Sequence, residues 1–189
     1  MSSQPKKLLT SAEYLVLERK AEFKSEYFAS EMFAMAGASQ RHNLIVANII
    51  RVLGNQLLER DCNVYPSDMR VKISKINKYT YPDIAVACGE EQFEDEQNDT
   101  LLNPVVIIEI LSESTEAYDD RGKKFEHYQS LESLREYLLI SQDPYRVEQY
   151  VRQDDRTWTY CEFHQAADTV HLPTIDCDLS LEDIYAKVA

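Results

Sequence analysis

The sequence predicts an α/β fold, with a mixed central β-sheet that is flanked by helices. Two observations predict it: helical apolar patterns stand near both ends of the chain, and the middle is rich in short apolar runs typical of strands. One run, VVIIEILS at residues 105–112, has the β-branched composition of a strand buried on both faces. With 189 residues, the chain is long enough for one core, and we expect a single domain over residues 1–189.

Three elements are predicted in the first third of the chain. Thr10 and Glu13 have the spacing of a capping box and predict a short helix over about residues 11–20. Loose alternation in EYFASEMFAMAG, residues 26–37, predicts a β-hairpin. After Ser39, a stripe of apolar residues predicts a helix of about five turns, at positions 45, 49, 52, 53 and 57.

The middle of the chain is predicted to supply buried strands. In NVYPSDMRVKI, residues 63–73, apolar and charged residues alternate, which predicts a half-exposed strand. YPDIAVACG, residues 81–89, predicts a buried strand that precedes the one at 105–112. Between them GEEQFEDEQNDT, residues 89–100, predicts a solvated and mobile acidic loop.

The last third begins with a helix and continues as strands. DDRGKKFEHYQSL predicts a helix with an exposed basic edge over residues 119–131, followed by a strand at 135–141. The segments 147–152 and 157–163 predict an antiparallel meander. A short capped helix at 180–188 closes the chain.

Composition argues against several classes of protein. No stretch approaches the roughly 20 apolar residues of a membrane span, and the N-terminus lacks an apolar secretory signal. The four histidines show no zinc-hydrolase spacing, and the four glycines form no phosphate-binding loop. The four cysteines form no CxxC pair, so we expect reduced thiols in a cytoplasmic protein.

The formal net charge of -13 argues against a purely electrostatic grip on nucleic acid, because basic residues supply most of that affinity. The charge is compatible with a carboxylate-rich cation site. It is compatible with nucleic acid only if basic residues gather on one face.

A carboxylate, Glu109, lies in the middle of the apolar run at 105–112. A buried ionised carboxylate is costly unless it is paired, hydrogen-bonded or bound to a metal ion. Asp83 begins the preceding buried strand, and if the two strands pair, both carboxylates converge near the strand ends. Two close carboxylates favour a hard divalent cation between them, Mg²⁺ or Mn²⁺. Such an ion would polarise a phosphoryl oxygen and activate a bound water.

A lysine beside the ion would orient the water or neutralise charge on the phosphate. Two residues beyond the strand carboxylate, on the same face, stands Leu111, which can do neither. The following helix offers Lys123 and Lys124. We favour Lys124, because Phe125 and Tyr128 would anchor its turn against the core.

Each candidate also has a purely structural interpretation. Glu109 could form a buried ion pair with Lys124 or Arg121, and Asp83 could accept backbone N–H groups in a turn. Lys124 could equally be a solvated helix residue. Glu26, in the predicted hairpin, is a candidate further metal ligand or base, and its structural alternative is an exposed charge.

Several segments resemble the Uma2 family, which belongs to the PD-(D/E)XK, restriction-endonuclease-like superfamily. They are PD at Pro82-Asp83, EIL from Glu109 to Leu111 running into Ser112, DRGKKFEHY, REYLLIS, MAGASQRHNLIVANI and LSLEDIY. In this order and spacing they extend over nearly the whole chain. The resemblance implies a restriction-endonuclease-like core and a metal-dependent phosphodiesterase.

The resemblance also implies roles for particular residues. Asp83 and Glu109 would be metal ligands, and Glu26 matches the family's upstream acidic residue. Lys124 would replace the superfamily's usual lysine two residues beyond the strand carboxylate, which Uma2-like sequences generally lack. His42 matches a position that the family often fills with histidine. At residue 30 a serine stands where the family often has glycine, which we interpret as a change in the hairpin turn.

We therefore predict a divalent-metal-dependent endonuclease that hydrolyses phosphodiester bonds of DNA, with Mg²⁺ or Mn²⁺ as cofactor. The alternative is a non-catalytic nucleic-acid-binding or assembly module that retains the nuclease fold. A third hypothesis keeps the metal site but takes RNA or another phosphodiester as the substrate. A homodimer is a further expectation from the resemblance, because related nucleases often pair to cut two strands, and no membrane partner is expected.

Overall fold

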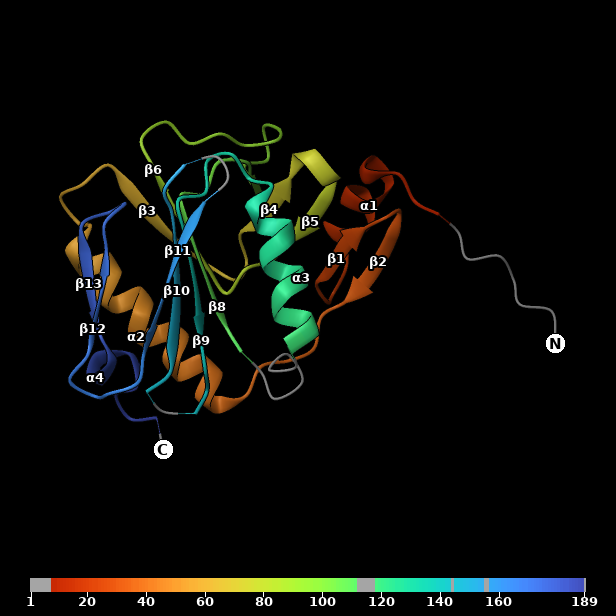
Figure 1. Ribbon diagram of the computed structural model, residues 1–189. Coiled ribbons are helices and arrows are strands. Elements are labelled where there is room, and N and C mark those ends of the chain that lie inside the picture. The colour runs from red at the N-terminus through yellow and green to blue at the C-terminus, as the bar shows by residue number, and fades with distance from the viewer. Residues whose placement is uncertain (1–7, 112–117, 144, 155–156, 189) are drawn as a thin grey trace.

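The computed structural model describes residues 8–111, 118–143, 145–154 and 157–188. These residues form three β-sheets with helices packed against them (Figure 1). The largest sheet has six strands in the order β11-β10-β9-β8-β6-β3. Their bounds in that order are Trp158–Phe163, Val147–Arg152, Glu136–Ile140, Val106–Ile110, Ile84–Cys88 and Cys62–Pro66.

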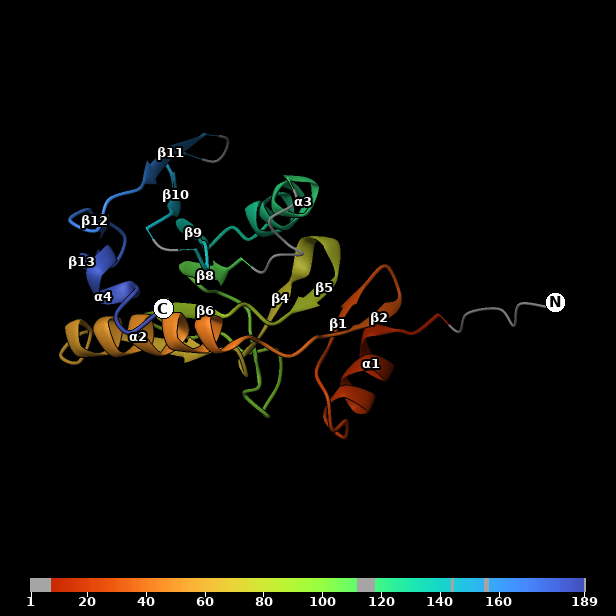
Figure 2. The same ribbon diagram turned by 90° about the horizontal axis from the view of Figure 1, so that it is seen from below.

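The six-stranded sheet is mixed and has a helix on each face. β8 and β9 are parallel, whereas the other neighbouring strands are antiparallel. Helix α2 (Gln40–Gln56) covers one face and α3 (Tyr118–Gln129) the other, as Figure 2 shows. On β8, Ile108 and Ile110 pack in the α2 layer, and Ile107 packs in the α3 layer. This arrangement confirms the predicted α/β fold with a mixed central sheet flanked by helices.

A second sheet is built mainly from the first part of the chain, in the order β2-β1-β5-β4-β7. Its strands in that order are Glu31–Ala34, Ser25–Phe28, Lys78–Thr80, Arg70–Ile73 and Thr100–Leu101. Helix α1 (Ser11–Glu18) packs on this sheet through three buried tyrosines. The ring centroid of Tyr14 lies 5.1 Å from that of Tyr27 and 5.2 Å from that of Tyr79.

A third, two-stranded sheet lies beside α2 and consists of β12 (Thr169–Leu172) and β13 (Cys177–Ser180) (Figure 1). The short helix α4 (Leu181–Ile184) follows it, and a 3-10 turn, η1 (Ser74–Ile76), follows β4. None of the helices in the described part of the chain is long and apolar enough to cross a membrane.

The start of α1 and the first hairpin have the predicted local structure. The N–H of Glu13 donates to Thr10 Oγ1 at 3.2 Å, and the N–H of Thr10 donates to the Glu13 carboxylate at 2.9 Å, which is a capping box. The hairpin of β1 and β2 turns at Ala29 and Ser30, whose φ angles are 50° and 65°. This left-handed backbone is the conformation that glycine adopts without strain.

The segment at 63–73 differs from its prediction as one half-exposed strand. The structure divides it between β3 of the six-stranded sheet and β4 of the five-stranded sheet. β4 is interior, because Arg70 is only 3% exposed, donates to the Tyr81 hydroxyl at 2.9 Å and pairs with Asp99 at 2.9 Å. The alternation of apolar and charged residues in this segment therefore did not indicate that its charged side chains are exposed to solvent. The sequence patterns also did not predict the short strands β5, β7, β12 and β13.

The acidic segment at 89–100 is largely irregular, as predicted, but several of its charges are paired with the protein. Arg19 binds the carboxylates of Asp95 and Asp99, each at 2.8 Å. Lys72 lies 2.5 Å from a carboxylate oxygen of Glu94. The segment is therefore less free than predicted, because basic residues far away in the sequence pair with these three carboxylates, although Asp95 itself stays exposed.

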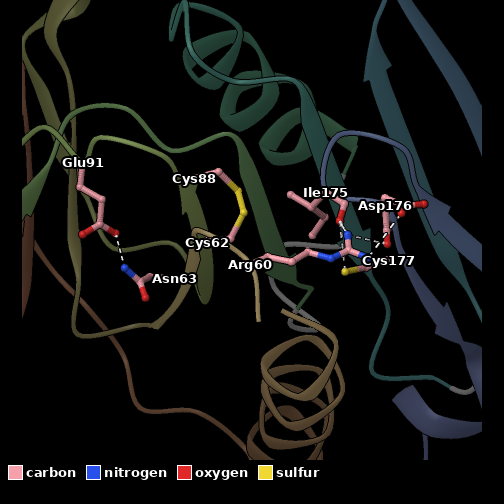
Figure 3. The surroundings of a disulfide bond; sticks show 8 residues. All are labelled: Arg60, Cys62, Asn63, Cys88, Glu91, Ile175, Asp176 and Cys177. Atoms are coloured by element: carbon pink, nitrogen blue, oxygen red, sulfur yellow. Dashed lines mark hydrogen bonds and ion pairs between the residues drawn. A yellow bond between two sulfur atoms is a disulfide. The ribbon is translucent and has the colours of Figure 1, made fainter. Parts of the chain in front are cut away.

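Cys62 and Cys88 form a disulfide bond between β3 and β6 (Figure 3). They are directly opposite each other in the antiparallel register of the two strands. The expectation that all four cysteines are reduced thiols is therefore wrong for this pair, since strand pairing and not sequence spacing brings them together. Cys161 and Cys177 are free thiols, as expected.

Candidate functional site

A cleft of about 1040 Å³ is lined by residues from both large sheets and from helices α2 and α3. All four residues predicted for the site line it, and they are Glu26, Asp83, Glu109 and Lys124. They come from β1, from the segment just before β6, from β8 and from α3. The fold therefore brings together four side chains that are widely separated in the sequence.

Glu109 lies on the α3 side of β8, and its side chain is only 6% exposed. The hydroxyl of Tyr128 donates to Glu109 Oε1 at 2.7 Å, and Lys124 Nζ lies 3.3 Å from Oε2. Both donors come from α3, one helical turn apart. Burial raises the pKa of Glu109, and the charge of Lys124 offsets part of that effect. The charge of Glu109 in turn raises the pKa of Lys124.

Asp83 is brought beside Glu109 by the pairing of β6 with β8, in which Ile84 lies opposite Ile108. This pairing confirms the predicted neighbourhood of the two strands. The N–H of Ile110 donates a hydrogen bond to Asp83 Oδ2 at 2.7 Å. The aspartate is thus hydrogen-bonded to the backbone of the residue that follows Glu109.

The other oxygen of Asp83 is held by α2. Nε2 of His42 lies 3.0 Å from Asp83 Oδ1, and the two side chains are 15% and 14% exposed. His42 is near the start of α2, where Ser39 Oγ caps the helix by accepting its N–H at 3.1 Å. Nδ1 of His42 is buried and has no hydrogen-bond partner among the described residues.

Glu26 lines the same cleft but is held by the five-stranded sheet. The hydroxyl of Thr80 donates to Glu26 Oε1, and Lys78 Nζ lies 3.5 Å from Oε2. The side chain of Glu26 is 21% exposed, so it is not the fully exposed hairpin charge of the structural alternative. The charge of Glu109 raises the pKa of Lys124 most, and the charges of Glu26 and of Asp83 raise it further.

Some of the contacts match the structural interpretations of the candidates. Glu109 pairs with Lys124, and Asp83 accepts a backbone N–H. Arg121, the other predicted partner of Glu109, lies outside the described side chains. Because both oxygens of each carboxylate have partners within the chain, these contacts alone do not require a metal ion.

The charge balance of the cleft favours a bound cation more clearly than the individual contacts do. Among the described residues that line it, five carry carboxylates and two are lysines: Glu22, Glu26, Asp68, Asp83 and Glu109 against Lys24 and Lys124. Lys24 is itself paired with Asp68 at 2.9 Å. An excess of negative charge in a partly buried cleft favours the binding of a cation.

The chemistry of the two central carboxylates fits a hard divalent ion. Within the described residues, no group of three or more His, Cys, Asp or Glu side chains is arranged as a metal cage. Mg²⁺ usually needs only one or two carboxylates, with waters and substrate phosphates as its other ligands. Asp83 and Glu109 match that donor set, and Glu26, which contacts Thr80 and Lys78, lines the same cleft.

Two contacts of the site were not predicted from the sequence. Tyr128 was expected only to anchor its helix turn, but its hydroxyl also binds Glu109. The signal was available, since Tyr128 and Lys124 are four residues apart on one helix face. His42 was singled out only by the family resemblance. Its contact with Asp83 joins distant segments and has no local signal.

Comparisons with known sequences agree on one family. The family model Uma2, described as "Putative restriction endonuclease", matches residues 11–183. Two proteins of Synechocystis sp. (strain ATCC 27184 / PCC 6803 / Kazusa) are similar, and both are described as uncharacterized. Protein sll1609 is 40% identical over 156 residues, which cover 82% of this chain and 88% of that protein. Protein slr1290 is 34% identical over 187 residues, which cover 99% of this chain and 96% of that protein.

A solved structure has a similar fold. It is the crystal structure of a "putative nuclease belonging to DUF820" from Anabaena variabilis ATCC 29413, with a TM-score of 0.74. The match covers 94% of this chain and 98% of that chain at 21% sequence identity. At this identity the likeness concerns the fold alone, and it confirms the predicted nuclease-like architecture.

Proposed function

The chain belongs to the Uma2 family, and from that premise we propose that it is a divalent-metal-dependent endonuclease that hydrolyses phosphodiester bonds of DNA. The observation that carries the proposal is the meeting of Asp83, Glu109 and Lys124 in one cleft where carboxylates outnumber lysines. The family description supports a nuclease. The excess of carboxylate oxygens supports the dependence on a metal ion.

In the proposed site, Asp83 and Glu109 would hold Mg²⁺ or Mn²⁺, and Glu26 would act as a further ligand or base. When bound, the ion polarises a phosphoryl oxygen and lowers the pKa of a bound water. Lys124 would neutralise charge that develops on the phosphate. The charge of Glu109 raises the pKa of Lys124 and so keeps the ammonium protonated.

The neighbours of the two carboxylates would orient them for this task. The Tyr128 hydroxyl fixes Glu109, and burial keeps the pKa of Tyr128 well above its usual value, so that this group remains a neutral donor. The backbone N–H of Ile110 and the ring of His42 fix Asp83. Held in this way, the carboxylates need little rearrangement to reach a productive geometry.

The test is the cleavage of plasmid and single-stranded DNA with Mg²⁺ or Mn²⁺, run beside an EDTA control. We expect metal-dependent nicking by the native chain and its loss in Asp83→Asn and in Glu109→Gln. Both replacements keep the shape of the side chain and remove its charge. Nicking that persists in EDTA or in both variants would contradict the proposed site.

The alternative function is a non-catalytic nucleic-acid-binding or assembly module. The observation that favours it is that Asp83 and Glu109 each have partners for both oxygens without a metal ion. Melting curves with and without Mg²⁺ or Mn²⁺ separate the two functions, because a bound ligand stabilises the native state. Cleavage of RNA instead of DNA would keep the site and change the substrate, and sedimentation would test the expected homodimer.

A further inference from the structure

An exposed aromatic ring stands in the cleft of the proposed nuclease site. Phe23 lies in the turn between α1 and β1, and it lines the same cleft as Asp83 and Glu109. It is 77% exposed, although single exposed apolar residues are common in proteins. What distinguishes Phe23 from the similarly exposed Leu58, at 78%, is its place in this cleft.

The backbone beside Phe23 is firmly held. The Lys24 ammonium donates to the carbonyl of Ser67 at 3.0 Å and pairs with Asp68 at 2.9 Å. The carbonyl of Lys24 accepts the N–H of Met35 at 3.0 Å. The N–H of Ser25 donates to the carboxylate of Glu18 at 2.9 Å. The ring therefore projects from a fixed segment, and a ligand would not have to order that segment on binding.

The ring of Phe23 has no role in the packing of the described protein. It belongs to none of the three hydrophobic clusters. None of the ring–ring or cation–ring contacts among the described residues involves it. An apolar face is thus free to meet a ligand in the cleft that Asp83 and Glu109 also line.

The charge of the cleft indicates which part of a nucleic acid Phe23 would contact. Both lysines of the lining are engaged in ion pairs, Lys24 with Asp68 and Lys124 with Glu109. With carboxylates in excess, the cleft offers little electrostatic affinity for phosphates before a metal ion binds. Stacking of a base on an aromatic ring does not depend on charge and is tolerant of sequence.

On the basis of the nuclease function proposed above, we propose that Phe23 stacks with an unpaired base of the substrate. In a duplex both faces of each base are already covered by neighbouring bases, so a ring can reach only a single strand or a flipped nucleotide. Phe23 thereby makes single-stranded or locally unpaired DNA the preferred substrate. It is a specificity-determining residue and takes no part in the bond-breaking step.

Binding in EDTA tests this inference without any catalysis. Fluorescence anisotropy would compare labelled oligothymidylate with an abasic oligomer of the same length, which has the same phosphates and no bases. We expect the native chain to prefer the oligomer with bases, and Phe23→Ala to weaken that binding on the order of 10-fold. Phe23→Trp should retain the preference, and Leu58→Ala, the matched loss of an exposed apolar side chain, should change nothing. Equal binding of both oligomers by the native chain, or unchanged binding by Phe23→Ala, would overturn the inference.

Cleavage assays separate a failure of this inference from a failure of the proposed function. With Mg²⁺ or Mn²⁺, the native chain should cut a single strand in preference to the matching duplex, and Phe23→Ala should lose that preference mainly through KM. Cleavage with an unchanged preference in Phe23→Ala would overturn the stacking role and leave the nuclease function intact. A chain that discriminates the two oligomers in EDTA but cleaves no nucleic acid would contradict the nuclease function and keep the stacking site.

Discussion

Glu109 and Glu136 are carboxylates buried in neighbouring strands of the same sheet, at 4% and 0% exposure, but their surroundings differ. Glu109 faces the α3 layer and the cleft, where Tyr128 and Lys124 meet its two oxygens. Glu136 begins β9 opposite Val106, whose side chain packs in the α2 layer. Within the described residues no lysine or arginine pairs with Glu136, and Thr174 and His171 are the groups that act on its carboxylate.

Burial of a carboxylate therefore does not by itself mark a functional site. Burial raises the pKa of both groups, and that of Glu136 reaches about 7. Only Glu109 also has a cation, a neutral donor and a second carboxylate in an open cleft. Glu136 has no comparable partners. Its protonated form is therefore favoured near neutral pH, because a buried charge without such partners is costly.

The largest expected difference is in activity. Glu109→Gln should reduce metal-dependent nicking on the order of 1000-fold, which corresponds to about 4 kcal/mol of transition-state stabilisation. Glu136→Gln, the matched amide replacement on the other face of the sheet, should remain within about 2-fold of the native rate. Nicking rates at saturating metal measure both. Equal losses in the two variants would show that the comparison reflects folding rather than catalysis.

Glu136 should contribute about 3 kcal/mol to the pH dependence of stability. Its pKa is about 7 in the folded chain and 4.5 as a free side chain. Between these values the unfolded chain loses its proton first, so this contribution to stability is present below pH 4.5 and is lost as the pH rises to 7. Thr174 is the main group that offsets part of this shift, and His171 offsets a smaller part.

Urea unfolding at several pH values measures this effect for the native chain and for Glu136→Gln, whose amide does not titrate. The stability of the native chain relative to the variant should fall as the pH rises from about 5 to about 8. A difference that stays constant with pH would contradict the raised pKa of Glu136.

Removal of Lys124 should leave Glu109, like Glu136, buried without a paired lysine. In Lys124→Met the carboxylate would lose its cation, and we expect a loss of about 2 kcal/mol of unfolding free energy at pH 8. The loss is smaller than for a fully buried pair because the lysine side chain is 32% exposed. Lys123→Met, one residue earlier and exposed, is the control and should be nearly neutral. Similar losses in the two variants, read from urea unfolding, would sink this prediction.

The smallest expected effect is the loss of the hydroxyl donor. Tyr128→Phe should cost about 1 to 2 kcal/mol, since it leaves a buried oxygen of Glu109 without its hydrogen bond. Tyr145→Phe, at an exposed tyrosine, is the matched control. Melting temperatures of the two variants check the prediction, and an unchanged value for Tyr128→Phe would mean that water replaces the donor.

Local sequence patterns were enough to predict the main helices and buried strands and to single out candidate residues of the site. Alternation placed Glu109 on the opposite face of its strand from Ile108 and Ile110, and the capping box fixed the start of α1. Helical spacing put Lys124 and Tyr128 on one face of α3. These features depend on neighbours within a few residues, so short segments of the sequence are enough to predict them.

Which distant groups meet depends on how the chain packs in three dimensions. The contact of His42 with Asp83, the Cys62–Cys88 disulfide and the pairing of the acidic loop with Arg19 join segments far apart in the chain. Local patterns cannot predict such contacts, because the energy of a charge or a thiol depends on what packing brings beside it. Glu109 could be singled out from its apolar run, whereas the burial of Glu136 became apparent only when the sheet was assembled.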